Sequence, residues 1–251
     1  MRSALAVEFT KLVHATLVRA TTVLTALGIA LICAVMLVAS GTKDPQLAAK
    51  LGPLVDPGGW AGYLASAAQV TAAADLIGCG MMLSWLFGRE FADGTITGLF
   101  ALPVSRPVIA AAKLCVYLAW VVFTSTALLC ALLVCGLAGG LGPIPADVLD
   151  AIGRQFALTI LTGLVAAPVA WAATVGRSVL AGVGTTIGIL VLAQLMVVAG
   201  AGPWFPFSTP ALWAVTGGAD VSLPQLALVL PIVLISTWLA LHAWRRLQLD
   251  R

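Results

Sequence analysis

The sequence predicts an all-α membrane protein with six transmembrane helices. Of its 251 residues, 61% are hydrophobic and only 9% are charged, and the mean hydropathy is +1.08. A soluble domain averages about 25% charged residues, so this chain has too few polar side chains to cover a globule, and lipid must surround most of it. A bilayer crossing takes about 20 apolar residues, which leaves room for six helices but for no separate soluble domain. We therefore expect residues 1–251 to form one transmembrane domain.

Each of the six apolar runs is long enough to cross a bilayer. The runs lie at residues 20–39, 64–87, 114–137, 156–175, 179–199 and 226–244. The third helix is expected to begin earlier, at Pro107, and the second to end at residues 88–90. Residues 176–178 are too few for anything but a tight turn between the fourth and fifth helices. Pro168 and Pro231 should kink the fourth and sixth helices, which membrane proteins tolerate when neighbouring helices satisfy the backbone.

The basic residues predict the orientation, because lysine and arginine gather in short cytoplasmic loops. Three of the thirteen would lie outside the cell: Lys43, Lys50 and Arg154. The other ten would lie on the cytoplasmic side: Arg2, Lys11, Arg19, Arg89, Arg106, Lys113, Arg177, Arg245, Arg246 and Arg251. Both termini are then cytoplasmic, which requires an even number of spans, and the protein is expected in the cell (inner or plasma) membrane.

An amphipathic helix is expected before the first span. Apolar side chains recur there at helical spacing: Leu5, Phe9, Leu12, Val13 and Thr16, with Glu8, Lys11 and Ala15 on the opposite face. Such a helix lies in the inner membrane interface, with its apolar face in the lipid. The charged portion extends to Arg19 and the apolar core that follows has about 20 residues, whereas a cleaved signal peptide has an apolar core of 7–15 residues. We therefore expect this segment to be retained.

Polar residues inside the spans are candidates for a substrate pathway. Asp75 is the one acidic residue deep in an apolar run, and Thr71 shares its helix face. A carboxylate at this depth should face the bundle interior or a cavity. It can serve the pathway or form a structural hydrogen bond between helices. Gln194 in the fifth span is a possible partner. Gly184 and Gly188 in that span would allow close helix packing, within the bundle in preference to a seam between two chains.

The loop between the second and third spans has the pattern of a short helix rather than of a simple connector. Asp93 is a plausible N-cap, and Ile96, Leu99 and Phe100 fall on one helical face. Pro103 ends the segment. The prediction is a short helix that shows an apolar face in the cytoplasm. Such a face binds either a protein groove or the lipid surface.

The same loop resembles that of type-2 ABC exporter permeases. The resemblance rests on Glu90-x3-Gly94-Thr95, the apolar turn, Pro103-Val104-Ser105-Arg106 and Lys113. In that family the segment is the coupling helix, which docks into a cleft of the nucleotide-binding subunit and transmits its closure. The resemblance therefore implies an ATPase-coupling role for Glu90, Asp93, Gly94, Thr95, Ile96, Leu99, Phe100, Pro103 and Arg106.

The family pattern extends over the rest of the chain. It includes an N-terminal elbow helix, six spans with cytoplasmic termini, and two short re-entrant helices between the last two spans. Residues 200–225 match the re-entrant segment, because they are too apolar for a free loop and too rich in proline for a span. The resemblance implies an outer gate formed by Phe205, Phe207, Pro210 and Trp213. The alternative is an aromatic belt at the membrane surface.

A source of energy is missing from the chain itself. It has no Gly-x4-Gly-Lys-Ser/Thr phosphate loop, so ATP and Mg²⁺ are expected on a separate ABC ATPase subunit and no cofactor on this chain. An intramembrane serine protease would need a histidine beside its serine, but His14 and His242 lie at helix ends. A metal-dependent lipid transferase would need several carboxylates, and Asp75 stands alone. The chain is therefore expected to be a permease and not an enzyme.

The expected function is export of a hydrophobic or amphiphilic substrate, such as a drug, a peptide antibiotic or a lipid. The alternative is a secondary transporter or a structural membrane protein. An ABC exporter needs two membrane halves, so a second permease chain is an expected partner, identical or different. Nucleic acid is not expected, because the basic residues occur singly, and the five cysteines within apolar runs indicate neither a disulfide framework nor a zinc site.

Overall fold

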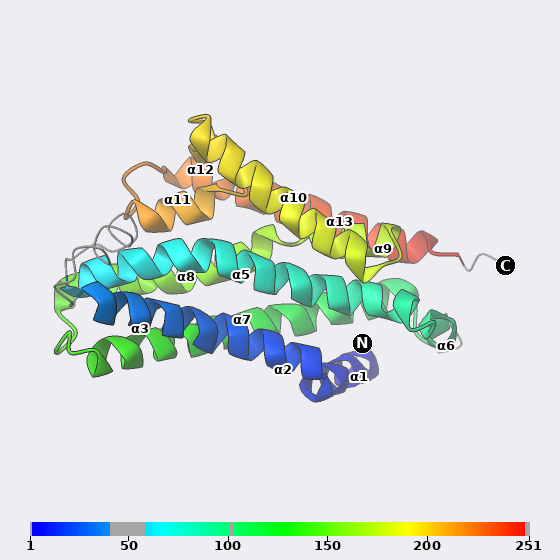
Figure 1. Cartoon of the computed structure of the whole chain (residues 1–251). Helices are drawn as coiled ribbons and strands as arrows, with labels where there is room; N and C mark the ends of the chain where they lie inside the picture. Colours follow the sequence, from blue (N-terminus) through cyan, green and yellow to red (C-terminus); the bar gives the residue numbers. More distant parts are fainter. Residues whose placement is uncertain (1, 41–58, 101–102, 249–251) are drawn as a thin grey trace.

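The computed structural model describes residues 2–40, 59–100 and 103–248, and these form helices joined by short loops (Figure 1). Six of the described helical segments are long and apolar enough to cross a membrane, as predicted: Thr16–Ala39, Gly59–Ala92, Arg106–Ala138, Ala146–Val175, Val179–Val198 and Leu223–Arg246. The first comprises α2 (Thr16–Val23), a π-helical turn η1 (Leu24–Gly28) and α3 (Ile29–Ser40). The second is α5 (Gly59–Ala92) and the third α7 (Arg106–Ala138).

The fourth span is broken, as Pro168 predicts. A 3₁₀ turn η2 (Ala146–Val148) leads into α8 (Leu149–Val165), and α9 (Pro168–Val175) continues after the break. The fifth span is α10 (Val179–Val198). The sixth consists of α12 (Leu223–Ala227) and α13 (Val229–Arg246), so its break falls at Leu228 and not at Pro231.

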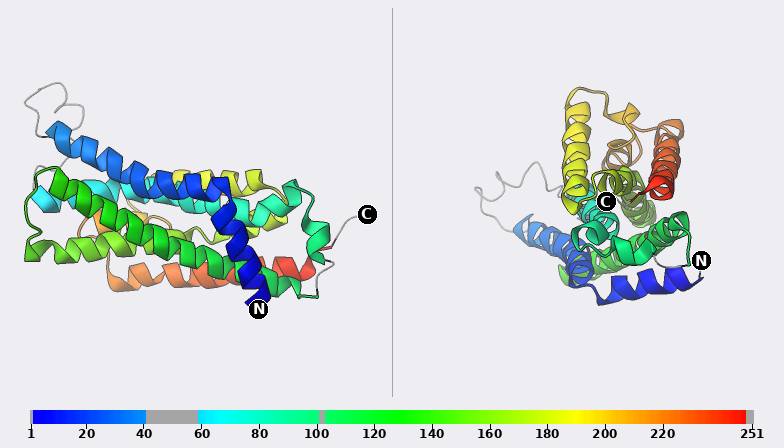
Figure 2. Two further views of the ribbon diagram at one scale, coloured as in Figure 1. Left: turned by 90° about the horizontal axis from the view of Figure 1, so that it is seen from below. Right: turned by 90° about the vertical axis from the view of Figure 1, so that its right-hand side faces the viewer.

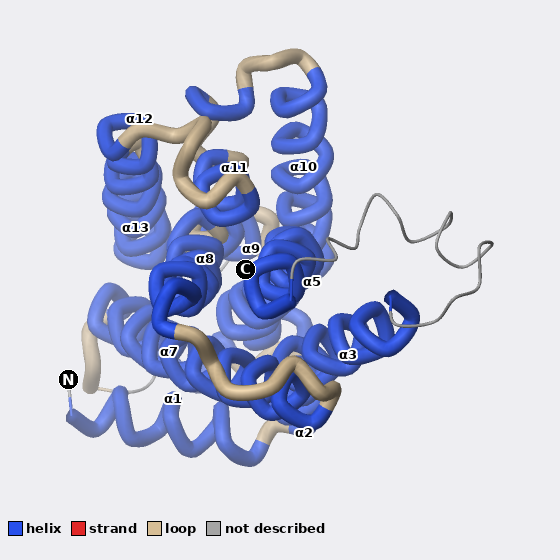
Figure 3. Tube along the Cα trace, turned by 90° about the vertical axis from the view of Figure 1, so that its left-hand side faces the viewer, coloured by secondary structure: helices blue, strands red, loops and turns tan. Residues whose placement is uncertain are grey.

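The long helix α5 lies in the middle of the bundle. It packs against α3, α7, α8, α9 and α10, and two-thirds of its most apolar window is buried. The view along the bundle shows α10, α11 (Thr209–Val215), α12 and α13 on one side of α5 and α8, and α1 (Arg2–His14), α2, α3 and α7 on the other (Figure 3). Helix α1 and the C-terminal end of α13 lie at the end of the bundle where α6 (Ile96–Phe100) is found (Figure 1).

The N-terminal helix α1 (Arg2–His14) is present, but its apolar and charged residues are not divided between two opposite faces as predicted. Its backbone turns at Ala15, which has extended dihedral angles, and α1 then crosses the end of α7 (Figure 2). The buried residues of α1 are Ala4, Glu8 and Leu12, whereas Phe9 and Val13 are exposed. The predicted separation of faces is therefore wrong, because Glu8 is buried on the same side as Leu12, where it pairs with Lys11 of α1 and Lys113 of α7.

Helix α5 continues beyond the predicted end of the second span, through residues 88–90 to Ala92. The glycine at position 88 does not end the helix but lets α10 approach it. A Cβ at this position would lie 2.5 Å from the backbone nitrogen of Val179, which cannot move aside. Gly88 is therefore placed where the turn of residues 176–178 meets α5. Arg177 in that turn has φ of 47°, and the Ser178 side chain accepts a hydrogen bond from the Leu180 amide.

The glycine pair predicted to pack α10 into the bundle does not do so. A Cβ at Gly184 or Gly188 would meet no heavy atom within 4 Å in the described part of the chain. The close approach is made by Gly182 instead, where a Cβ would lie 2.4 Å from the Ser84 hydroxyl oxygen. The two glycines do share one face of α10, but that face points away from α5.

Residues 200–225 form two short helical pieces in addition to α12. A 3₁₀ turn η3 (Gly202–Trp204) is followed by α11 (Thr209–Val215), which packs against α5 and α8. The Ser208 hydroxyl donates to the carbonyl of Gly202 and the Thr209 hydroxyl to that of Phe205. The first of these bonds ties η3 to the start of α11. The position of this segment within the membrane stays a prediction.

Candidate functional site

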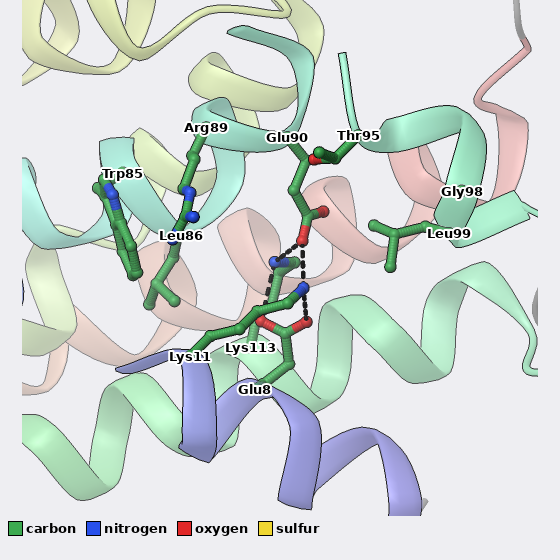
Figure 4. A pocket seen from close by; sticks show the side chains of 10 residues that line it. All are labelled: Glu8, Lys11, Trp85, Leu86, Arg89, Glu90, Thr95, Gly98, Leu99 and Lys113. Carbon is green, nitrogen blue, oxygen red and sulfur yellow. Dashed lines mark hydrogen bonds and ion pairs between the residues drawn. The ribbon is translucent and has the colours of Figure 1, made fainter. Parts of the chain in front are cut away.

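A cluster of four charged side chains joins three helices at the end of the bundle near the termini (Figure 4). Glu8 and Lys11 come from α1, Glu90 from the last turns of α5, and Lys113 from the third turn of α7. Each lysine contacts both carboxylates. Lys113 Nζ lies 3.0 Å from Glu8 and 2.9 Å from Glu90, and Lys11 Nζ lies 3.0 Å from Glu8 and 2.8 Å from Glu90. We call these four residues the charge cluster.

Burial makes the charge cluster unlike an ordinary surface ion pair. The side chains of Glu8 and Lys113 are 2% exposed and that of Glu90 is 6% exposed, while Lys11 is 34% exposed. Buried charges are stable only when they are paired and hydrogen-bonded. The cluster therefore holds α1, α5 and α7 in one arrangement, because separating any of them would leave a buried charge without its partner.

The electrostatics of α1 agree with this arrangement. Burial opposes the ionisation of Glu8, but Lys113 and Lys11 outweigh it and lower the pKa of this carboxyl. Burial also opposes the charge of Lys11, but its hydrogen bond to Glu90 and the nearby carboxylates raise the pKa of its ammonium group. The stabilisation from Glu8 is present above its unfolded pKa of about 4.3 and is lost as the pH falls through the lowered value. That from Lys11 is present below about pH 10.4 and is lost as the pH rises through the raised value.

The charge cluster also connects to the last helix through aromatic side chains. The Lys113 ammonium lies 5.8 Å from the ring centroid of Trp244 in α13, within the range of a cation–π contact. Trp244 is fully buried, donates from Nε1 to the Thr174 hydroxyl, and meets Phe87 edge to face at 6.1 Å. The helix ends α5, α7, α9 and α13 are therefore fixed around the same point.

The turn between α5 and α7 sits directly over the charge cluster. A cavity of about 220 Å³ there is lined by the four charged residues and by Trp85, Leu86, Arg89, Thr95, Gly98 and Leu99. Ile96 is 8% exposed and belongs to the main core, and Leu99 packs against that core. The prediction that this apolar face is open to the cytoplasm is therefore wrong for Ile96, because its side chain is used to anchor α6 on the chain itself. The side chain of Phe100 lies outside the described residues.

The exposed part of the turn consists of small and polar residues. It comprises Asp93, Gly94, Thr95, Thr97 and Gly98, which we call the outer face. Asp93 does not begin α6 as predicted. Its carboxylate accepts from Arg89 Nε at 2.9 Å, and α6 begins after Gly94, whose φ of 67° makes the turn.

Farther along, Pro103 is exposed and Ser105 occupies the N-cap position of α7, with Pro107 in the first turn as predicted. Arg106 reaches across the bundle and donates to the carbonyl of Leu247 after α13.

The structure separates Gln194 from the other two pathway candidates. Thr71 and Asp75 are buried in α5, whereas Gln194 is exposed on α10. Gln194 lines a cavity of about 250 Å³ between α5, α10 and α11, together with Gln69, Leu76, Phe207 and Ser208. Among the described residues, Gln194 is thus not the partner of Asp75. The pathway role of all three stays a prediction.

Thr71 has an unforeseen partner in Gln155 of α8, whose Nε2 donates to the Thr71 hydroxyl oxygen at 2.9 Å. Asp75 accepts only from the Cys79 thiol at 3.8 Å, and its Oδ2 has no partner in the described part of the chain.

We therefore expect Thr71→Val to lower the free energy of unfolding by about 1–3 kcal/mol, because the buried Gln155 amide loses its acceptor. Asp75→Asn should cost less, since a thiol is a weak donor. Unfolding midpoints of both variants in the same detergent check this order, and a larger loss for Asp75→Asn would contradict it.

The outer-gate candidates lie together on the segment after α10. Phe205 and Phe207 have ring centroids 5.3 Å apart, Pro210 is buried in the first turn of α11, and Trp213 packs with Leu158 and Ala214. Phe207 lines the same cavity as Gln194. Their role as a gate stays a prediction.

Sequence reasoning missed three members of the charge cluster as site residues: Glu8, Lys11 and Lys113. The available signal was Lys113, which lies well inside an apolar helix after three alanines. A cation at that depth requires a partner, and Glu8 with Lys11 on an otherwise apolar helix supplies the matching charges.

The comparisons agree with the architecture. The family model described as ABC-2 family transporter protein matches residues 4–193, which include most of α1, the first four spans, the charge cluster, α6 and most of α10. No curated protein matches the chain significantly. Because the family model covers well over half of the sequence, the chain belongs to the ABC-2 family of transporter proteins and is a membrane-spanning permease subunit of an ABC transporter.

Proposed function

We propose that this permease exports a hydrophobic or amphiphilic substrate, and that its α5–α6–α7 turn is the coupling element on which a separate ABC ATPase acts. The observation that carries the proposal is the way the turn is fastened. Ile96 and Leu99 pack into the chain's own core. Directly beneath the turn, the ion pairs of the charge cluster join α1, α5 and α7. A force on this turn therefore moves three helices together.

The surface offered to the ATPase in this proposal is the outer face, not the apolar side of α6. Thr97 and Gly98 are exposed, and a side chain added at Gly98 would meet no heavy atom within 4 Å. Small residues allow a partner's cleft to close around the helix backbone. Asp93 and Arg89 at the rim add a charged pair that can orient the partner. ATP and Mg²⁺ are bound by the ATPase subunit in this scheme.

The cavity between α5, α10 and α11 supports an amphiphilic substrate. It is lined mainly by apolar side chains, with Gln69, Gln194 and Ser208 as polar groups. Apolar walls with a few polar groups are typical of sites for small amphiphiles. Phe207 at one border of this cavity supports the outer-gate role of the segment after α10. A second permease chain would complete the pathway, as in other ABC exporters.

The proposal requires the outer face and both termini to be cytoplasmic. We expect Asp147→Cys and Asp220→Cys, each in a cysteine-free background, to be labelled in intact cells by a membrane-impermeant maleimide, because both positions are exposed at the opposite end of the bundle. Thr97→Cys should be labelled only after the cells are opened. Position 97 is preferred to Gly94, whose positive φ would strain any other residue. Labelling of position 97 in intact cells would contradict the proposal, because no cytoplasmic ATPase could reach it.

A further inference from the structure

An apolar groove lies on the lipid-facing side of the bundle, where α1 turns away from α2. The turn at Ala15 leaves a corner between α1, α2 and α7 (Figure 2), and this corner encloses about 580 Å³. Its lining is almost entirely hydrocarbon, with Phe9 and Val13 from α1, Val23 from α2 and Ala119 and Phe123 from α7, and Arg19 lies among these residues. We call it the α1–α7 groove.

The polar atoms of the α1–α7 groove are satisfied except at one place. The Thr22 hydroxyl donates to the carbonyl of Val18 at 2.7 Å and accepts from Trp120 Nε1 at 2.8 Å, so neither side chain offers a free polar group to a ligand. Arg19 is exposed, and the described residues place no hydrogen-bond or ion-pair partner on its guanidinium group. The groove is therefore a hydrocarbon surface with a single cation at its edge.

We propose that the α1–α7 groove binds one anionic phospholipid, with an acyl chain along the groove and the phosphate on Arg19. The side chains around it are those of a bilayer-facing surface, since Val23 and Phe123 are exposed apolar residues of two membrane spans. Arg19 lies in the first turn of the first span, and an arginine where a span begins can bind a headgroup phosphate through two parallel hydrogen bonds. A volume of 580 Å³ lies within the range of small-ligand sites. The lipid would come from the leaflet on the side of the termini.

The proposal gives the lipid a structural consequence. Helix α1 carries Glu8 and Lys11 of the charge cluster on its inward face, and Phe9, Leu12 and Val13 of the groove beside them. A lipid in the groove therefore packs against the helix that the cluster holds. The bound lipid would pack against the exposed side of α1, which no other part of the described chain covers.

Native mass spectrometry of the purified chain, reconstituted with phosphatidylglycerol or phosphatidylcholine of the same acyl chains, tests the proposal. We expect the wild type to retain one phospholipid per chain after a mild detergent wash, with phosphatidylglycerol preferred at least about fivefold. Ala119→Trp, on an exposed groove position, should abolish this retention. Leu118→Trp, on the neighbouring exposed position outside the groove, should not.

The charge is tested separately. Arg19→Gln should bind both lipids equally, whereas Arg245→Gln, an exposed arginine at the same end of the bundle, should keep the preference. The proposal is wrong if Ala119→Trp retains lipid as Leu118→Trp does, or if Arg19→Gln keeps the preference for phosphatidylglycerol. It is also wrong if Ala119→Trp shifts the chain from dimer to monomer without changing lipid retention, because the groove is then a contact between chains. Should Ala119→Trp fail to fold, the Arg19→Gln and Arg245→Gln pair decides alone.

Discussion

Lys113→Met is expected to destabilise the protein by about 3–5 kcal/mol, because it removes the cation that pairs with two buried carboxylates. Glu8 and Glu90 lie 3.0 and 2.9 Å from the Lys113 ammonium, and Lys11 alone would have to balance both. In a protein of this size, 1 kcal/mol corresponds to about 2–4 °C in Tm. We therefore expect Tm in detergent to fall by about 6–20 °C, with a parallel loss of transport.

Two variants separate this effect from a general loss of charge. Asp93→Asn breaks the exposed pair with Arg89, where both side chains are about half exposed, so its cost should stay below about 1 kcal/mol. Adding Glu8→Gln to Lys113→Met should recover part of the lost stability, since it removes one of the uncompensated charges. If Lys113→Met melts within 2 °C of Asp93→Asn, the charge cluster does not hold the helices together.

Gly98→Trp is expected to separate the permease from its ATPase while the permease itself remains folded. Gly98 is helical and exposed, and a side chain there meets nothing within 4 Å. An indole in this place therefore has open space at the outer face, beside the cavity that Gly98 borders, and would obstruct a partner that docks there. We expect the affinity for the ATPase to fall more than about tenfold, which corresponds to about 1.4 kcal/mol. Copurification and substrate-stimulated ATP hydrolysis measure the loss.

Gly153→Trp is the matched control, because Gly153 is also an exposed helical glycine with open space around it, in α8 near the opposite end of the bundle. It should leave ATPase binding unchanged. Leu99→Asp is a less selective test, because Leu99 packs against the core and its replacement would also loosen α6. Normal copurification of Gly98→Trp would exclude the outer face as the docking surface.

The number and order of the spans were predictable, because they depend on bulk hydropathy. Each apolar run is long enough to be recognised without knowing its neighbours, and the breaks at Pro168 and at residues 176–178 follow from local backbone chemistry. The end of α5 was not predictable in the same way. In the sequence Gly88 resembles a residue that ends a helix. In the structure it lies within α5, and glycine is needed there because the backbone of α10 occupies the space that a Cβ would take.

The site was predicted less completely, because helix faces depend on contacts that sequence spacing does not contain. Glu8 was assigned to the face opposite the apolar residues of α1, yet it is buried beside Leu12, where it pairs with Lys113 of a distant helix. Ile96 was assigned to a partner because it is apolar, yet the core of the chain itself takes it. The pairing of Thr71 with Gln155 was missed for the same reason, since it joins positions 84 residues apart.

Photo-crosslinking at position 97 tests the central claim most directly. Benzoylphenylalanine replaces Thr97 on the outer face, or Gly153 at the opposite end of the bundle. The variants are expressed in cells together with the genes that naturally flank the permease gene, and the captured proteins are sequenced. We predict that position 97 captures a soluble protein with a Gly-x4-Gly-Lys-Ser/Thr phosphate loop and that position 153 does not. If position 97 captures no such ATPase, or if position 153 captures it equally well, the α5–α6–α7 turn is not where ATP hydrolysis is coupled to this permease.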